Sequence, residues 1–207
     1  MIITEIKQKG KSESYYVSFD GELYGTLQLE TLVKNHIKLG CEIDEEQLKV
    51  IKEDDDNLTC FSRALKYISS RLKTEKQMLE YLRGLNYSQV AIDNAIKKLK
   101  DYGYINDEYY AKTFAEVYGA SKGKNYIKRE LALKGVNKEH IEEIIQDKDD
   151  TSACLALCQK KLKTLKQPLE QKYKQKLYRF LLSRGFDYET IRQTLAKCNM
   201  GEDDAWD

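Results

Sequence analysis

The chain has 207 residues, of which 41% are hydrophobic and 33% are charged. Its formal net charge of +1 provides no overall field that would draw it to nucleic acid or to a membrane, so any such attraction must come from local patches. No apolar run has the length of a signal peptide or of a membrane span, and we therefore expect a cytoplasmic protein with no membrane partner.

The first segment of the chain predicts a β-hairpin. YYVSF and ELYGTL are separated by Asp20 and Gly21, a pair typical of the two-residue turn between antiparallel strands. MIITEIK, at the start of the chain, is a candidate third strand.

Two helices are expected after the hairpin. Apolar spacing predicts one over residues 29–39, ending at Gly40, and another over residues 44–51. The acidic run Glu53–Asp56 then marks a predicted boundary. We take residues 1–57 as an N-terminal domain made of the hairpin and these two helices.

Three later segments repeat one pattern at intervals of 49 and 50 residues: LRGLNYSQVAI (82–92), LALKGVNKEHI (131–141) and LLSRGFDYETI (181–191). In each, an aligned Leu is followed four positions later by Asn or Gly, which tolerate the left-handed conformation that ends a helix. Then come an apolar residue, a residue that is a good N-cap for the next helix, and an Ile that begins the apolar stripe of that helix. The pattern predicts a helix end, a tight turn and a helix start in three successive copies.

The fold class is therefore mainly all-α: a tandem array of three three-helix repeats, preceded by a small domain with a β-hairpin. Thr74 and Gln77 predict a capping box in the first repeat, Asn106 or Asp107 caps the first helix of the second, and Pro168 opens the second helix of the third. Stacked units of this size predict an elongated, curved array. The predicted divisions are residues 58–105, 106–150 and 151–200, with an acidic tail at 201–207.

No motif in the sequence indicates a catalytic site, a cofactor site or a metal site. Motifs for nucleotide phosphates, dinucleotides, zinc proteases and hydrolase nucleophiles do not occur. The five cysteines are scattered and odd in number, which argues against a disulfide framework and favours buried thiols. We expect a protein that acts by binding and is not an enzyme.

Basic residues are gathered unevenly and suggest a binding surface. Residues 151–185 carry seven Lys and two Arg against one Glu, and KNYIKRELALK in the second repeat is also basic, with Tyr118 and Tyr126 nearby. These groups could bind phosphate and stack on bases, meet an acidic protein surface, or form a solvated face balanced by the acidic segment EHIEEIIQD. The candidate contacts are Lys122, Lys124, Lys128, Arg129, Arg71, Lys73, Lys160, Lys161, Lys163 and Arg184.

Four stretches resemble the RecX family of regulatory proteins: YISSRLKTEKQMLEYL, GYINDEYYAKTF, GKNYIKRELALKGV and KLYRFLLSRGFDYETI. The similarity covers about residues 58–200, and the N-terminal hairpin with its two helices is similar to the extension of the longer, Gram-positive type. Leu72 stands where many relatives have Pro, and Tyr118 where a basic residue is expected.

This resemblance implies a negative regulator of the RecA recombinase. Members of the family are helical-repeat proteins that lie in the groove of the RecA–DNA filament and inhibit ATP turnover and strand exchange, with no cofactor. We expect a monomer with the RecA filament as partner, and single- or double-stranded DNA as a further candidate. The alternatives are a module that binds single-stranded DNA and affects recombination indirectly, and a helical scaffold for an unrelated partner.

Overall fold

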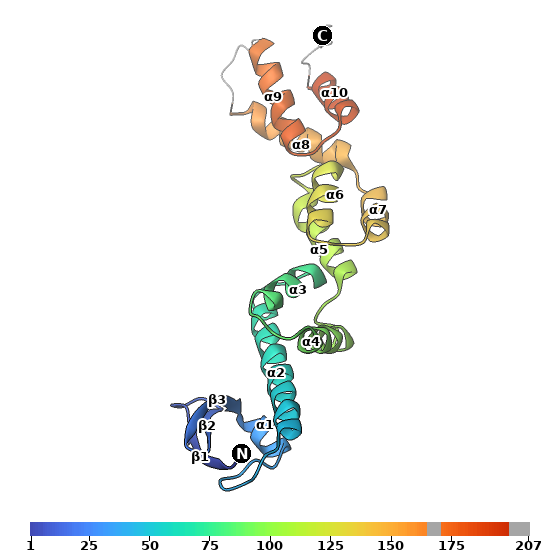
Figure 1. Ribbon diagram of the computed structural model, residues 1–207. Helices are drawn as coiled ribbons and strands as arrows, with labels where there is room; N and C mark the ends of the chain where they lie inside the picture. Colours follow the sequence, from blue (N-terminus) through green and yellow to red (C-terminus); the bar gives the residue numbers. More distant parts are fainter. Residues whose placement is uncertain (165–170, 199–207) are drawn as a thin grey trace. The chain divides into compact units, whose positions relative to one another are not determined.

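The computed structural model describes residues 1–164 and 171–198, over which the chain forms a three-stranded sheet followed by ten helices (Figure 1). The chain is organised as two compact units, the first being Met1–Ile105 and the second beginning at Asn106. Within the described residues, every helix is either too short or too polar to cross a membrane.

The N-terminal sheet contains β1 (Ile3–Gln8), β2 (Ser14–Phe19) and β3 (Glu22–Gln28), paired antiparallel in that order. The candidate third strand is thus confirmed. Asp20 and Gly21 form the predicted two-residue turn, and both have the positive φ angles, 49° and 88°, that this turn requires.

Helix α1 (Leu29–Lys34) is shorter than the helix expected over 29–39, and that prediction was wrong in length. The chain leaves the helix at His36, which has a φ of 51°. The amide of Ile37 then donates to the Leu32 carbonyl at 2.8 Å, a bond that closes a helix end. This early turn brings Ile37 into the core beneath the sheet, so burial decided the end of the helix.

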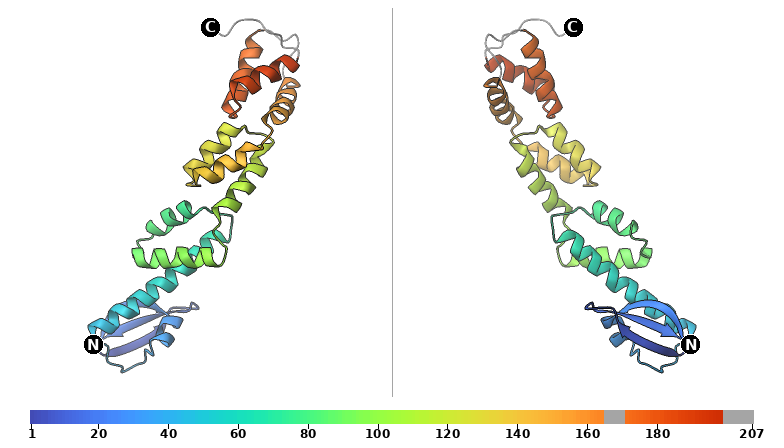
Figure 2. Two further views of the ribbon diagram at one scale, coloured as in Figure 1. Left: turned by 90° about the vertical axis from the view of Figure 1, so that its right-hand side faces the viewer. Right: turned by 90° about the vertical axis from the view of Figure 1, so that its left-hand side faces the viewer.

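Helix α2 (Glu45–Ile68) is continuous through the region where we expected a helix over 44–51 and then a boundary at Glu53–Asp56. It begins with a capping box between Asp44 and Gln47, and no Gly or Pro interrupts it. Its first half covers the core beneath the sheet and its second half belongs to the first repeat (Figure 2). The helix is thus longer than predicted, and the acidic run lies inside it.

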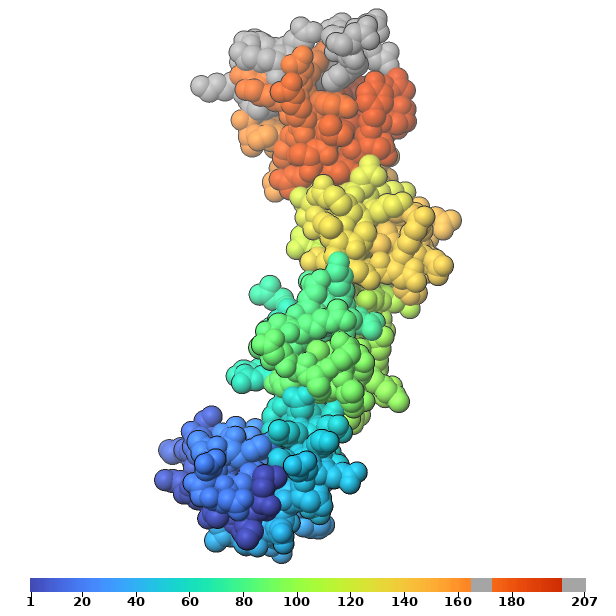
Figure 3. Space-filling view, viewed as in Figure 1, coloured from blue at the N-terminus to red at the C-terminus, as the bar shows by residue number. Residues whose placement is uncertain are grey.

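The acidic run connects the N-terminal domain to the first repeat through hydrogen bonds. Asp55 accepts hydrogen bonds from the amide of Gln28 at 2.7 Å and from the hydroxyl of Thr31 at 2.8 Å. Asp56 accepts from the amide of Ser88, in the first repeat, at 3.1 Å. Successive residues of a helix point in different directions, which lets neighbouring carboxylates reach both sides. The sheet (dark blue) and the start of α2 (cyan) abut in Figure 3.

We expect Asp55→Asn to destabilise the protein by about 1–3 kcal/mol, since the partly buried charge receives two hydrogen bonds. Urea unfolding would measure this loss. Glu53→Gln is the matched control because Glu53 lies on the same helix with an exposed side chain. Equal unfolding midpoints for the two variants would show that the hydrogen bonds to Asp55 do not stabilise the protein.

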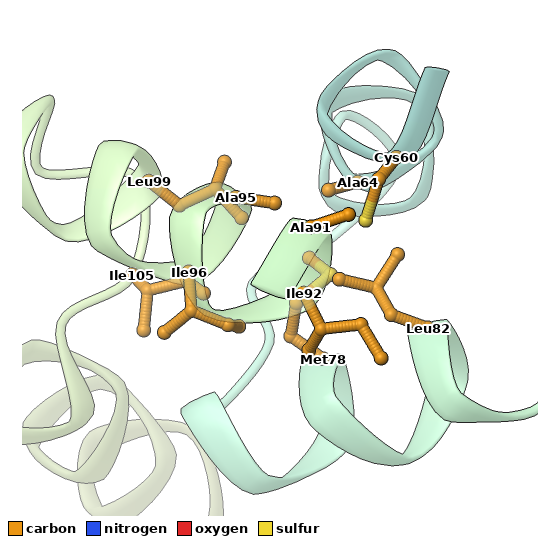
Figure 4. Close-up of a cluster of buried hydrophobic side chains, with 10 residues drawn as sticks. All are labelled: Cys60, Ala64, Met78, Leu82, Ala91, Ile92, Ala95, Ile96, Leu99 and Ile105. Atoms are coloured by element: carbon orange, nitrogen blue, oxygen red, sulfur yellow. The ribbon is translucent and has the colours of Figure 1, made fainter. Parts of the chain in front are cut away.

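The first repeat is completed by α3 (Glu75–Arg83) and α4 (Gln89–Asp101). Thr74 and Gln77 form the predicted capping box. Figure 4 shows how side chains from α2, α3 and α4 meet in one apolar core. Its members are Cys60, Ala64, Met78, Leu82, Ala91, Ile92, Ala95, Ile96, Leu99 and Ile105.

The second unit contains the second and third repeats, each with its own core. Asn106 caps the first helix, as one of the two predicted alternatives. The expectations for Pro168 and for the tail at 201–207 lie outside the described residues. The helices are α5 (Asp107–Gly119), α6 (Lys124–Leu133), α7 (Lys138–Gln146), α8 (Asp150–Leu162), α9 (Gln171–Ser183) and α10 (Tyr188–Lys197).

The aligned positions of the three repeats play the same structural part, as predicted. The aligned leucines are fully buried, and the residues four positions later have φ angles of 60°, 84° and 87°. Each following N-cap side chain accepts a hydrogen bond from a backbone amide at the start of the next helix. These caps are Ser88, Asn137 and Asp187.

Candidate functional site

Two cations lie over one tyrosine where the second and third repeats meet, and a third cation lies near one of them. We call Lys122, Tyr126, Arg129 and Arg184 the Tyr126 cluster. The Lys122 ammonium lies 3.9 Å from the centre of the Tyr126 ring, and the Arg129 guanidinium lies 5.4 Å from it. Both distances allow a cation–π contact.

Arg184 brings a third positive charge, from the third repeat. Its guanidinium lies 5.0 Å from the ring centre of Phe180. Burial, followed by the repulsion of Arg184, lowers the pKa of the Lys122 ammonium, whereas the Glu130 carboxylate acts in the opposite direction. An anionic group placed between Lys122 and Arg184 would relieve this repulsion.

Two glycines hold the two repeats together at this point. The amide of Gly123 donates to the Arg184 carbonyl at 3.0 Å, and the amide of Asn125 donates to the Gly185 carbonyl at 3.2 Å. A Cβ atom on Gly123 would lie 2.3 Å from the Gly185 oxygen, and one on Gly185 would lie 2.4 Å from Tyr126. This close approach of two backbones places Lys122 beside Arg184.

A buried ion pair supports the same junction. Asp150 forms an ion pair with Lys148, and both side chains are nearly buried. The Asp150 carboxylate also accepts a hydrogen bond from the amide of Lys124 at 2.8 Å. The start of α8 is thereby tied to the start of α6.

Lys124 and Lys128 are not part of the Tyr126 cluster. The ammonium of Lys124 donates to the Gln146 carbonyl at 3.3 Å. Lys128 forms an ion pair with Glu142 of α7, and this hydrogen bond lowers the pKa of the Glu142 carboxyl. These two lysines therefore fit the alternative of a solvated face balanced by the acidic helix.

The first repeat carries a similar arrangement. The Lys73 ammonium lies 4.3 Å from the ring centre of Tyr67, and Tyr67 stacks on Tyr81 with 3.9 Å between the ring centres. Lys73 and Lys122 each stand directly before the N-cap of the second helix of their repeat. We call Tyr67, Lys73 and Tyr81 the Tyr67 cluster. Arg71 is exposed in the loop that leads to it.

The remaining candidates lie at the end of α8. Lys161 lies 5.5 Å from the ring centre of Phe180, the ring that Arg184 also faces. Lys160 and Lys163 are exposed. Lys161 thus shares an aromatic ring with Arg184, a member of the Tyr126 cluster.

Sequence reasoning missed the glycine contact and the Lys148–Asp150 pair. One signal was present: Gly123 stands where the first repeat has the N-cap Thr74. A glycine in place of a capping side chain indicates a close backbone approach. Over the parts of the chain that are described, no group of three or more His, Cys, Asp or Glu is arranged to hold a metal ion.

Family models match all three repeats. They describe the first, second and third three-helix domains of RecX and match residues 60–99, 106–145 and 148–195. The Regulatory protein RecX of Clostridium botulinum (strain Alaska E43 / Type E3) is 36% identical over 199 residues, covering 93% of this chain and 94% of the relative. That of Caldanaerobacter subterraneus is 33% identical over 201 residues, covering 94% and 98%.

Two solved structures have a similar fold. A crystal structure of regulatory protein RecX covers 94% of this chain and 98% of its own, with a TM-score of 0.68 and 22% identity. The crystal structure of RecX from Lactobacillus salivarius covers 72% of this chain and 99% of its own, with a TM-score of 0.63 and 26% identity.

Proposed function

Because this chain belongs to the RecX family of regulatory proteins, we propose that it is a negative regulator of homologous recombination that binds the RecA filament on DNA. It inhibits ATP turnover and strand exchange by RecA through binding alone, as a cytoplasmic monomer that needs no cofactor.

The repeated architecture supports a partner that is itself periodic. Lys73 and Lys122 occupy the same position in successive repeats, and each lies over a tyrosine ring. A filament presents the same acidic or phosphate groups to each repeat in turn, so that several weak contacts add up through avidity. This equivalence of position is the observation that carries the proposal.

We propose the Tyr126 cluster as the principal contact. Its cations come from two repeats whose backbones are joined by hydrogen bonds, and Lys122 and Arg129 already lie over the Tyr126 ring, so that less rearrangement is needed on binding. Lys122 forms no ion pair among the described residues, so its charge is available to an anionic partner.

The alternative is a module that binds single-stranded DNA without RecA. The tyrosines beside cations favour it, since bases stack on aromatic rings and phosphates attract lysine and arginine. The overall charge of +1 favours the filament instead, because proteins that bind bare DNA through its backbone depend on an excess of positive charge.

One binding assay separates these functions. Labelled protein is titrated with bare single-stranded DNA and with the same DNA saturated with RecA and a non-hydrolysable ATP analogue. We expect binding to the RecA-coated DNA to be at least about tenfold tighter, which is 1.4 kcal/mol. RecA ATP turnover should fall over the same range of protein concentration.

Equal binding to bare and coated DNA would contradict the filament proposal and favour the DNA-binding module. Tight binding to coated DNA with unchanged ATP turnover would contradict the inhibitory part alone.

A further inference from the structure

Two thiols of the third repeat lie in contact although they are far apart in the sequence. Cys158 is on α8 and Cys198 directly follows α10, and their sulfur atoms are 3.4 Å apart. Cys158 is fully buried and Cys198 is partly exposed. No other two cysteine sulfurs in the described part of the chain are recorded in contact.

We propose that Cys158 and Cys198 form a reversible intrachain disulfide when the protein meets hydrogen peroxide. The inference rests on the packing of α8 against α10 and is independent of the proposed function. It assigns a modification site to a repeat whose cysteines looked like ordinary buried thiols.

The surroundings of the two thiols give them different roles. Burial, followed by the hydrogen bond with Cys198, raises the pKa of the Cys158 thiol, so Cys158 stays protonated at rest and does not react first. Cys198 is the thiol that solvent can reach. We therefore assign the first reaction to Cys198 and the second, resolving reaction to Cys158.

The chemistry balances with one peroxide molecule. The Cys198 thiolate attacks a peroxide oxygen, the O–O bond breaks, and the released hydroxide takes up the proton lost by the thiol. The Cys158 sulfur then attacks the sulfenic sulfur of Cys198. The S–S bond forms, the S–O bond breaks, and the hydroxide leaves with the Cys158 proton as a second water. Two electrons pass from the two sulfurs to the peroxide.

The bond would stabilise the third repeat. It joins the end of α10 to α8 and closes a loop of the chain that contains α9 and α10. A cross-link across a loop of this length reduces the freedom of the unfolded chain, which favours the folded state. We expect the melting temperature to rise by several degrees on oxidation and to return on reduction.

The test uses the full chain with its five thiols reduced. The protein is treated with hydrogen peroxide, the peroxide is removed, and remaining thiols are alkylated before proteolysis and mass spectrometry without reductant. We expect three alkylated cysteines, one cross-linked peptide pair containing Cys158 and Cys198, and a monomer on non-reducing electrophoresis.

Cys198→Ser should abolish the cross-link and the rise in melting temperature. Cys41→Ser, which removes another partly exposed thiol, should leave both unchanged.

Three results would overturn the proposal. One is a cross-link from Cys198 to Cys154, which lies one helical turn before Cys158. The second is disulfides between chains. The third is a protein in which Cys198 stays reduced, or is oxidised to the sulfinic acid, while Cys158 remains a free thiol.

Discussion

Gly123→Ala is expected to destabilise the second unit by about 2–5 kcal/mol. The new Cβ would lie 2.3 Å from the Gly185 carbonyl oxygen, which no pair of such atoms tolerates, so the two backbones must separate. Gly123 has a φ of −80°, which any residue adopts. The expected loss therefore comes from the steric clash and from the hydrogen bonds across the junction, with no share from backbone strain.

Gly119→Ala is the matched control for this variant. Gly119 ends α5, four residues earlier, and a Cβ there would meet Lys148 at 3.6 Å, an ordinary contact. Because Ala is the better helix former, we expect no loss of stability and a gain of up to about 1 kcal/mol. Thermal and urea unfolding of both variants would measure the difference.

The same junction should matter for binding. If the backbones of the second and third repeats separate, Lys122 and Arg184 no longer lie beside each other, so Gly123→Ala should also weaken binding to the RecA-coated DNA. A Gly123→Ala protein that melts and binds like the parent would show that the two repeats are not joined through these glycines.

The double variant Lys122→Ala/Arg184→Ala is expected to weaken binding to RecA-coated DNA by on the order of tenfold. Burial and then the repulsion of Arg184 lower the pKa of Lys122 in the free protein, and an anionic partner relieves that repulsion. The dependence of binding on salt should become flatter, since fewer screened contacts remain. Folding stability should stay within about 1 kcal/mol, because neither side chain belongs to the apolar core.

Lys124→Ala/Lys128→Ala is the control, since it removes the same charge from the same unit. Lys124 and Lys128 already have partners within the second repeat, a backbone carbonyl and the Glu142 carboxylate. We expect this control to change binding by less than about threefold, because an exposed charge with a local partner contributes little. Equal losses for the two double variants would mean that net charge, and not the Tyr126 cluster, determines binding.

The same variants distinguish RecA from DNA as the partner of the cluster. If the contacts are to RecA, Lys122→Ala/Arg184→Ala should leave the weak binding to bare single-stranded DNA nearly unchanged. If they are to DNA, both affinities should fall in parallel. We expect the first outcome because the near-zero net charge favours a protein partner.

The repeats and their turns could be predicted from the sequence because each depends on residues only a few positions apart. A capping side chain reaches an amide two or three residues ahead, and a left-handed residue closes the turn beside it. Ser88, Asn137 and Asp187 are therefore recognisable without knowledge of the fold. The family resemblance follows from the same local stretches.

Where an element depends on contacts with distant parts of the chain, only the tertiary structure determined its bounds. Apolar spacing alone extended the helix at residues 29–39 too far, because the burial of Ile37 ends it. The run Glu53–Asp56 predicts a boundary by composition, yet it lies within a continuous helix, and its carboxylates accept hydrogen bonds from the N-terminal domain and from the first repeat.

The tertiary structure also determined which of the basic residues have partners within the fold. Composition marks ten cations as equivalent, but packing pairs Lys128 with Glu142 and leaves Lys122 beside Arg184. Those contacts depend on how helices of two repeats meet, which in turn depends on two glycines 62 positions apart in the numbering, Gly123 and Gly185. Local sequence patterns determine where each helix begins and ends, whereas the approach of separate helices determines which charges remain available for a partner.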